Sequence, residues 1–188
     1  MGFHTFPVER ADKLEDPSRY RFCSREELVE MLDLGSDSDS DAVVADLGSG
    51  TGFYSRDVAP FVDTLYAVDV QEEMHERHRE EGVAANVELV TAGVDSLPFD
   101  DDQLDGAFST MTHHEYATDE TLAELARVIR PGGRLVTVDW SAAGTGEDGP
   151  SMDERFGPDE VAGHLEDAGF SVDRAHDRPE TLAVVARR

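Results

Sequence analysis

The sequence predicts an α/β protein in which strands and helices alternate around a glycine-rich turn. An apolar run that begins Val43-Val44-Ala45 is rich in β-branched residues, which is typical of a buried strand. Glycines interrupt the run at Gly48, Gly50 and Gly52, and an apolar segment of helical character follows. A second strand, Thr64–Asp69, ends in an acid 17 positions after Gly52. At 188 residues, the chain is long enough for one domain with a substantial core.

The spacing of the glycines narrows the class of ligand that the turn can bind. A phosphate-binding P-loop needs a lysine after its glycines, and this sequence has none there. A dinucleotide site needs a third glycine where this sequence has Phe53. Glycines still let a ligand approach the backbone closely, and a carboxylate at Asp69 can accept hydrogen bonds from both hydroxyls of a ribose. The turn therefore favours an uncharged or zwitterionic part of a nucleoside ligand.

The rest of the chain continues the alternation of strands and helices. We expect strands over Asn86–Thr91, Leu104–Met111 and Arg134–Trp140, helices over Gln71–Glu81, from Thr118 to the Pro131-Gly132-Gly133 turn and from Pro158 to Gly169, a loop over Ser141–Gly157 and a closing pair of strands, Phe170–His176 and Thr181–Ala186. Because ligands bind at the carboxyl ends of the strands in such sheets, Ser109 to Tyr116 should lie at the site.

The first part of the chain is predicted to be an arm and one helix. Residues 1–20 have no apolar periodicity, so we expect an irregular arm. Ser24 and Glu27 form a capping box that predicts a helix over Arg25–Leu34. The polar loop Gly35–Asp41 then leads into the first strand. We therefore expect a single domain over 1–188, with an arm and helix in 1–35 and the core in 41–188.

Four motifs occur in an order that resembles a known family. They are Asp46-Leu47-Gly48-Ser49-Gly50-Thr51-Gly52, Ala67-Val68-Asp69, Leu97-Pro98-Phe99 and Arg127-Val128-Ile129-Arg130-Pro131-Gly132-Gly133-Arg134-Leu135. From about Asp41 onward the chain resembles the class I S-adenosylmethionine-dependent methyltransferases, specifically the ubiquinone/menaquinone-biosynthesis branch. The resemblance implies a Rossmann-like, seven-stranded, mostly parallel sheet in the order 3-2-1-4-5-7-6, with helices on both faces.

The resemblance also implies S-adenosyl-L-methionine as the cofactor and a set of residues that bind it. These residues are Asp46, Gly48, Ser49, Gly50, Thr51, Gly52, Asp69, Val70, Met74, Val94, Asp95 and Ser109. Met74 either packs on the adenine ring or belongs to the core. Because the acid that usually contacts adenine is replaced by Gly93, that contact falls either to Asp95 or to the backbone of Val94.

Methyl transfer from a sulfonium is an in-line displacement that needs alignment and exclusion of water rather than a nucleophilic residue. A general base is needed only where the acceptor must lose a proton. His113 and His114 are the first candidates by position and Glu115 the third, with a purely structural role as the alternative for the histidines. His75 and His78 lie among Glu and Arg, so we expect both to be solvated. We expect no metal site, because adjacent residues rarely converge on one ion.

The composition limits the cellular compartment and the kinds of partner that we expect for the protein. A net charge of -26 comes from 42 acidic and 16 basic residues, and Lys13 is the only lysine. Salt screens such self-repulsion, so we expect a halophilic protein. The charge argues against nucleic acid as substrate. No run approaches the ~18 apolar residues of a membrane span, no signal-peptide pattern opens the chain, and Cys23 is the only cysteine, so we expect a cytoplasmic protein that does not bind membranes.

The favoured acceptor is a small molecule, such as an apolar ring or a quinone precursor. A cover for it can be built from the aromatic residues of the arm, the region after the fourth strand, the end of the fifth strand and the loop that follows; these are Phe3, Phe6, Tyr20, Phe22, Tyr116, Trp140 and Phe156. We expect a monomer or a homodimer. The alternative function is a non-catalytic S-adenosylmethionine-binding or regulatory domain that needs a partner.

Overall fold

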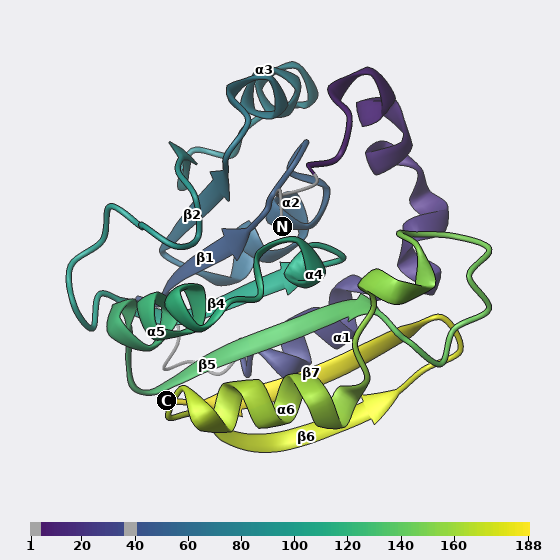
Figure 1. The fold of residues 1–188 in the computed structure, drawn as a ribbon. Coiled ribbons are helices and arrows are strands. Elements are labelled where there is room, and N and C mark those ends of the chain that lie inside the picture. The colour runs from purple at the N-terminus through teal and green to yellow at the C-terminus, as the bar shows by residue number, and fades with distance from the viewer. Residues whose placement is uncertain (1–4, 36–40) are drawn as a thin grey trace.

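A computed structural model describes residues 5–35 and 41–188 of the chain. It contains a seven-stranded sheet in the order β3-β2-β1-β4-β5-β7-β6, with helices packed on its faces (Figure 1). β3, β2, β1, β4 and β5 pair in parallel, and β7 pairs antiparallel with both β5 and β6. This confirms the predicted fold class and strand order. Phe3 and part of the Gly35–Asp41 loop lie outside the described residues.

The elements have the following bounds. The strands are β1 (Val43–Leu47), β2 (Thr64–Asp69), β3 (Val87–Thr91), β4 (Leu104–Thr110), β5 (Ile129–Trp140), β6 (Ser171–Asp177) and β7 (Thr181–Arg187). The α-helices are α1 (Arg25–Met31), α2 (Phe53–Val58), α3 (Glu72–Glu81), α4 (His113–Tyr116), α5 (Asp119–Val128) and α6 (Pro158–Asp167). Short 3₁₀ helices are η1 (Val8–Glu15), η2 (Pro17–Arg21), η3 (Ala59–Phe61) and η4 (Met152–Glu154).

The central strands are buried on both faces, as covered parallel sheets require. On one face, Ala45 of β1 joins a cluster with Leu125 of α5 and Leu165 of α6. On the other face, Val44, which directly precedes Ala45, joins a cluster with Leu28 of α1. Strand pleating sends successive side chains to opposite faces, so one continuous apolar run supplies both cores. The carboxyl ends of the strands are left to carry the site.

Two predicted boundaries differ from the structure by three residues or more. α1 ends at Met31 rather than Leu34, because Asp33 adopts a left-handed conformation with φ of 60° that ends the helical turn. β5 begins at Ile129 rather than Arg134: Gly132 donates a backbone hydrogen bond to Arg188 O at 2.6 Å and Gly133 O accepts one from Arg188 at 3.0 Å, so the glycine turn is held in the sheet.

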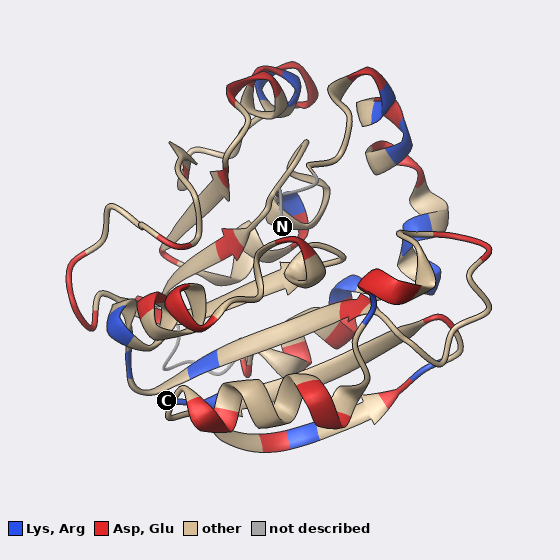
Figure 2. Ribbon diagram, viewed as in Figure 1, with Lys and Arg blue, Asp and Glu red and all other residues tan. Residues whose placement is uncertain are grey.

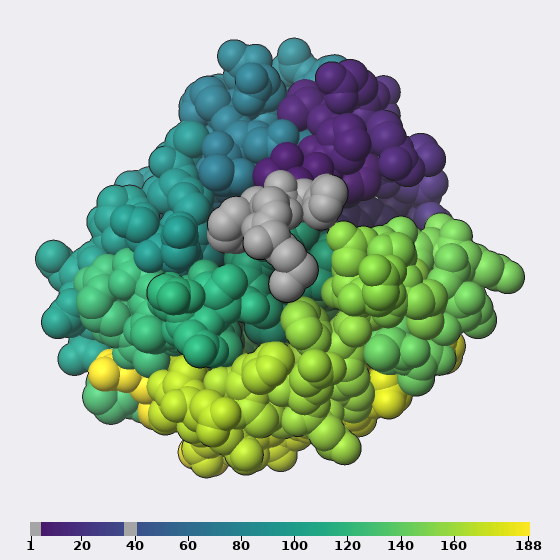
Figure 3. Space-filling model, viewed as in Figure 1, coloured from purple at the N-terminus to yellow at the C-terminus, as the bar shows by residue number. Residues whose placement is uncertain are grey.

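The arm forms the two 3₁₀ helices η1 and η2 rather than an irregular segment, and it packs on α2 and the glycine turn. Glu15 accepts hydrogen bonds from the side chains of Thr51 and Arg56. The Tyr20 hydroxyl donates to Asp57 at 2.9 Å. In Figure 3 the arm and the loop between β5 and α6 lie side by side on one face of the molecule, where Arg21 and Asp148 form an ion pair of 2.7 Å.

The expectation that His75 and His78 are solvated is wrong. Both side chains are fully buried on the inner face of α3. The glycine turn makes room for His78, because a side chain at Gly52 would collide with its ring. Burial, with help from the positive charge of Arg56, lowers the pKa of His78 to about 4, so this imidazole is neutral.

The charged side chains are distributed over the outer elements, with acids prominent on α3, α5, α6 and the connecting loops (Figure 2). Within residues 5–35 and 41–188, no helix has the length and apolar character that a membrane crossing requires.

Candidate functional site

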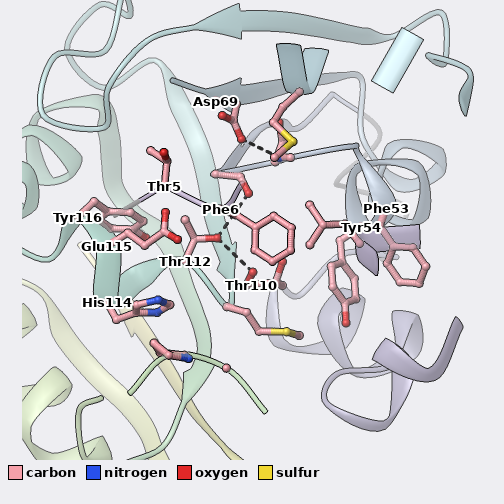
Figure 4. A pocket seen from close by; sticks show the side chains of 18 of the residues that line it. Thr5, Phe6, Phe53, Tyr54, Asp69, Thr110, Thr112, His114, Glu115 and Tyr116 are labelled. Atoms are coloured by element: carbon pink, nitrogen blue, oxygen red, sulfur yellow. Dashed lines mark hydrogen bonds between the residues drawn. The ribbon is translucent and has the colours of Figure 1, made fainter. Parts of the chain in front are cut away.

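A pocket of about 1090 Å³ lies at the carboxyl ends of β1, β2, β4 and β5, under the arm and the loop after β5 (Figure 4). The sheet contributes the glycine turn, the end of β2 and the segment after β4 to its wall. The arm contributes Phe6, Arg19 and Phe22, and the loop contributes Asp148 to Pro150. Ligands bind at this place in open α/β sheets, where the strand order reverses between β1 and β4.

The glycine turn is fastened to the end of β2 by backbone hydrogen bonds. Gly48 and Ser49 both donate to Val68 O at 2.9 Å. Gly48 has φ of 72°, and a side chain there would collide with Thr112 of the segment after β4. The turn therefore needs glycine both for its conformation and for its close approach to the neighbouring segment.

Asp69 is held by two backbone N–H groups at the end of β2. Its Oδ2 accepts from Gly50 N at 2.8 Å and its Oδ1 from Gln71 N at 2.9 Å. Burial raises the pKa of Asp69 above its ordinary value, against the effect of these two hydrogen bonds. Because a carboxylate has about four acceptor positions, Asp69 keeps two for a ligand. The predicted contact with a ribose diol would use these two positions.

The wall beside Asp69 is apolar and fits a flat base. Met74 of α3 is buried in the wall, whereas Val70 is exposed. Val94 and Asp95 both line the pocket, so both predicted alternatives for the contact with the base lie at the site.

Five of the residues predicted for the site lie behind the pocket wall rather than in it: Asp46, Thr51, Gly52, Ser109 and His113. The Asp46 Oδ2 accepts from Ser55 Oγ at 2.6 Å, and its buried Oδ1 has no hydrogen-bond partner among the described residues. Burial raises the pKa of Asp46 to about 7. The Thr51 side chain turns to Glu15, and Ser109 is buried inside β4.

The tandem histidines face different environments. His113 is buried against Tyr116, with ring centroids 5.3 Å apart, and burial lowers its pKa to about 4. His114 lines the pocket, and its Nδ1 lies 2.9 Å from Asp139 Oδ1. The backbone N–H of His114 also donates to Asp139 Oδ2 at 2.6 Å. The structure thus separates a packing histidine from one whose ring is oriented by a carboxylate.

The environment of His114 sets its charge. Burial opposes the imidazolium form, but the hydrogen bond and negative charge of Asp139 outweigh burial, and the pKa of His114 rises. Asp139 accepts a hydrogen bond from the Nδ1–H group, so Nε2 is the ring nitrogen left for chemistry. Glu115 also lines the pocket, and burial raises its pKa to about 7.

The predicted aromatic cover is formed in part. Phe6, Phe22, Tyr116 and Trp140 line the pocket, and Phe22 packs edge-on against Trp140 with centroids 4.8 Å apart. Neither Tyr20 nor Phe156 is in the wall. The Phe6 ring lies in the middle of the view in Figure 4, and the Phe6 carbonyl accepts from Gln71 Nε2 at 3.1 Å.

Sequence reasoning missed Asp139 and Arg19. Asp139 had a signal, because an acid between Val138 and Trp140 in a strand that is otherwise apolar at this end needs a partner. Arg19 had none, because the arm has no periodicity that places its side chains.

The pocket fits S-adenosylmethionine by three observations. The volume accommodates a ligand of that size. The glycine turn is a cradle that side chains at Gly48 and Gly52 would disrupt. The wall combines the Asp69 carboxylate, which can accept hydrogen bonds from ribose hydroxyls, with the apolar side chain of Met74.

Comparison with known proteins agrees with this geometry. Residues 45–137 match a family described as a methyltransferase domain. The ubiquinone/menaquinone biosynthesis C-methyltransferase UbiE of Ectopseudomonas mendocina is 34% identical over 113 residues, which cover 54% of this chain and 43% of that protein. The chain thus spans less than half the length of this curated relative.

Solved structures resemble the whole chain. An S-adenosylmethionine-dependent methyltransferase from Aquifex aeolicus has a TM-score of 0.86 and 31% identity, covering 97% of this chain and 98% of its own. A chain of the complex between the Haloferax volcanii Trm112 methyltransferase activator and a putative methyltransferase has a TM-score of 0.76 and 19% identity, covering 96% of both chains. The second likeness concerns the fold alone.

Proposed function

The chain belongs to the S-adenosylmethionine-dependent methyltransferases, and from that premise we propose that it transfers a methyl group from S-adenosylmethionine to a small-molecule acceptor. One observation carries the proposal. The glycine turn and Asp69 share the wall of one pocket with His114, so a nucleoside site and a proton acceptor face the same space. A domain that only binds the cofactor has no need of the second feature.

We assign the cofactor to the β2 side of the pocket. The Asp69 carboxylate would accept hydrogen bonds from the ribose, and Met74 would pack on the adenine. Asp95 or the backbone of Val94 would contact the edge of the base. When bound, the cofactor supplies a methyl group on a positively charged sulfur, which is already activated for displacement. The chain's own contribution is therefore to orient the reactants and exclude water.

The arm and the loop after β5 support the exclusion of water. Phe22 of the arm packs on Trp140, and Arg21 pairs with Asp148 of the loop. These contacts join the arm to the loop after β5. An acceptor inside this cover would meet the aromatic faces of Phe22, Tyr116 and Trp140. We therefore propose an acceptor with an apolar ring, which is consistent with the quinone-biosynthesis names of the curated relatives.

We propose His114 as the group that removes a proton from the acceptor. Asp139 holds the ring by Nδ1, which leaves a lone pair on Nε2 in the neutral form. The same contact makes the neutral imidazole a stronger base by raising its pKa. Glu115 shares the pocket, and its charge raises the pKa of His114 while His114 lowers that of Glu115, so the two groups would act as a coupled pair. His113 would only support this segment by packing.

A transfer assay tests the proposed function. The protein is incubated with S-adenosylmethionine that carries a deuterated methyl group, together with a panel of phenols and hydroquinones, and the products are analysed by mass spectrometry. We expect one acceptor class to gain a single labelled methyl group, and His114→Gln to abolish the gain. Failure of the folded protein to bind S-adenosylmethionine in calorimetry would overturn the proposal. Tight binding without transfer to any acceptor would favour the non-catalytic alternative.

We also propose that the protein works in concentrated salt. The support is a net charge of -26 with a single lysine, on a chain whose outer helices are rich in acids (Figure 2). Screening reduces the repulsion among these acids in the compact state. The free energy of unfolding should therefore rise from dilute buffer to molar potassium chloride, as measured by thermal and urea unfolding. A free energy of unfolding that is unchanged by salt would contradict the proposal.

A further inference from the structure

Arg19 stands out among the arginines of the chain. Within the described ranges, every arginine forms an ion pair with a carboxylate except Arg10, Arg19 and Arg155. Arg155 donates to the carbonyl oxygens of Asp148 and Pro150. Arg10 is exposed and lies over the Phe6 ring, 5.5 Å from its centroid. In a chain with 42 acidic residues against 16 basic ones, a guanidinium without a carboxylate partner is unexpected.

The surroundings of Arg19 leave most of its donors unused. Its Nη1 donates to Leu14 O at 2.8 Å, and its Nη2 lies 3.9 Å from Met111 Sδ, which is a weak acceptor. The centre of the guanidinium lies 5.2 Å from the ring centroids of both Phe53 and Tyr54. A guanidinium has five N–H donors, so the group is oriented by aromatic faces but not saturated by acceptors.

Arg19 is also partly removed from water. Burial lowers its pKa below the ordinary value, but an arginine stays charged in proteins. The negative charges of Asp46 and Glu15 act against this shift, but neither carboxylate forms an ion pair with Arg19, and a desolvated charge without a direct partner is costly. Because Arg19 lines the pocket, an anionic group of a ligand can supply the missing partner.

The position of Arg19 identifies which part of the ligand that is. Asp69 lies at the end of β2, whereas Arg19 contacts Met111 after β4 and the aromatic pair at the start of α2. Figure 4 draws Phe53 and Tyr54 on the side of the view opposite to His114 and Glu115. A nucleoside whose ribose lies at Asp69 and whose sulfur faces the His114 end has one anionic group left to place, the carboxylate of its amino-acid tail.

We propose that the Arg19 guanidinium binds the α-carboxylate of S-adenosylmethionine. The inference rests on the proposed function. Planar guanidinium and carboxylate groups pair through two parallel hydrogen bonds, and both are then desolvated together. The arm that carries Arg19 is fixed by Glu15 to Thr51 and Arg56. The arm thus provides a binding residue for the cofactor as well as a cover for the pocket.

Calorimetry with two ligands tests the proposal. S-adenosylhomocysteine carries the carboxylate, and its decarboxylated analogue, S-adenosyl-3-thiopropylamine, lacks only that group. We expect Arg19→Gln to weaken S-adenosylhomocysteine binding by about 10- to 100-fold, as the loss of hydrogen bonds between charged groups would. We expect the same variant to change the affinity for the analogue by less than about threefold, which is the scatter of a neutral change.

The control variant is Arg25→Gln. Arg25 pairs with Glu26 at 3.0 Å on the surface outside the pocket, so this variant removes the same charge and should leave both affinities unchanged. Equal losses for both ligands in Arg19→Gln would mean that Arg19 only shapes the site, and would overturn the proposal. The proposal would also be overturned if Arg10→Gln, and not Arg19→Gln, selectively weakened the binding of S-adenosylhomocysteine. If the wild type binds neither ligand, the proposed function itself fails.

Discussion

Beside β2, the pocket wall consists of the glycine turn and one fixed carboxylate, whereas beside β4 and β5 it presents side chains held by separate segments. At the first end, Gly50 and Gln71 hold Asp69 within a stretch of neighbouring sequence. At the second end, His114 depends on Asp139, and the cover depends on the pairing of Arg21 with Asp148. The comparison indicates that the glycine turn and strand pairing specify the β2 end, whereas the other end depends on contacts between side chains of separate elements.

The largest expected effect tests the β4 and β5 end. His114→Gln should lower kcat by about 100- to 10,000-fold, the usual contribution of a general base. The affinity for S-adenosylhomocysteine should change by less than about threefold, because the ring lies outside the proposed cofactor half. Steady-state kinetics and calorimetry measure the two quantities separately. An equal loss of both would contradict the division of the pocket.

The pH profile sharpens the same test. His114 must be neutral to accept a proton, so kcat/KM should rise with pH through an apparent pKa above 6.5, the ordinary value from which Asp139 raises it. Asp139→Asn removes the charge that raises this pKa, and the rising limb should move to lower pH. If Asp139→Asn lowers kcat/KM but leaves the apparent pKa of the profile unchanged, Asp139 acts on folding alone.

The next effect tests the β2 end. Asp69→Asn keeps the shape but removes the charge, and it places an amide beside the N–H groups of Gly50 and Gln71. We expect a loss of about 10- to 100-fold in affinity for S-adenosylhomocysteine, from weakened hydrogen bonds to a charged group. Glu80→Gln is the matched control, since its ion pair with Arg77 lies on the exposed face of α3. An unchanged affinity in Asp69→Asn would remove this residue from the site.

A separate effect concerns the stability of the fold near the glycine turn, where Asp46 is buried. Burial raises the pKa of Asp46 to about 7, so the folded chain keeps a proton that the unfolded chain loses above about pH 4. The contribution of this group to the free energy of unfolding therefore falls as the pH rises from about 4 to 7. Asp46→Asn cannot ionise and should be more stable than the wild type at pH 8, by up to roughly 4 kcal/mol for a pKa that lies about three above its ordinary value.

Urea unfolding at several pH values checks this prediction. The difference between Asp46→Asn and the wild type should shrink toward zero as the pH approaches 4, which makes the acidic samples an internal control. A constant difference at every pH would show that the effect does not come from ionisation of this carboxyl.

The smallest effect concerns the cover. Arg21 and Asp148 form an ion pair whose side chains are more than half exposed, so Arg21→Gln should change the free energy of unfolding by less than about 0.5 kcal/mol. The change should vanish in molar salt. A loss of more than about 1 kcal/mol, measured by thermal unfolding, would mean that the contact between arm and loop is part of the stable core.

The sequence allowed the β2 half to be predicted because the pairing of consecutive strands brings its parts together. Gly48 and Asp69 follow consecutive strands, and parallel pairing alone brings their ends together. His114 and Asp139 also follow or end neighbouring strands, but their hydrogen bond depends on the conformation of α4, which no local pattern specifies.

The histidines of α3 show a different limit. His75 and His78 stand among charged residues, yet both are buried, and the ring of His78 occupies the space left by the missing side chain of Gly52. The position of Met74 next to His75, and of His78 one turn later, was the available signal, since these three residues share one helical face. The arm was beyond prediction because short 3₁₀ helices carry no periodic pattern and gain their order from contacts such as Glu15 with Thr51.

A crystal structure of the protein with S-adenosylhomocysteine tests the central claim most directly. The account predicts that the ribose hydroxyls lie within hydrogen-bond distance of Asp69, that the sulfur faces the segment of His114, and that the tail carboxylate contacts Arg19. A nucleoside bound in another orientation, or outside the pocket at the glycine turn, would contradict both the proposed function and the division of the pocket into two halves.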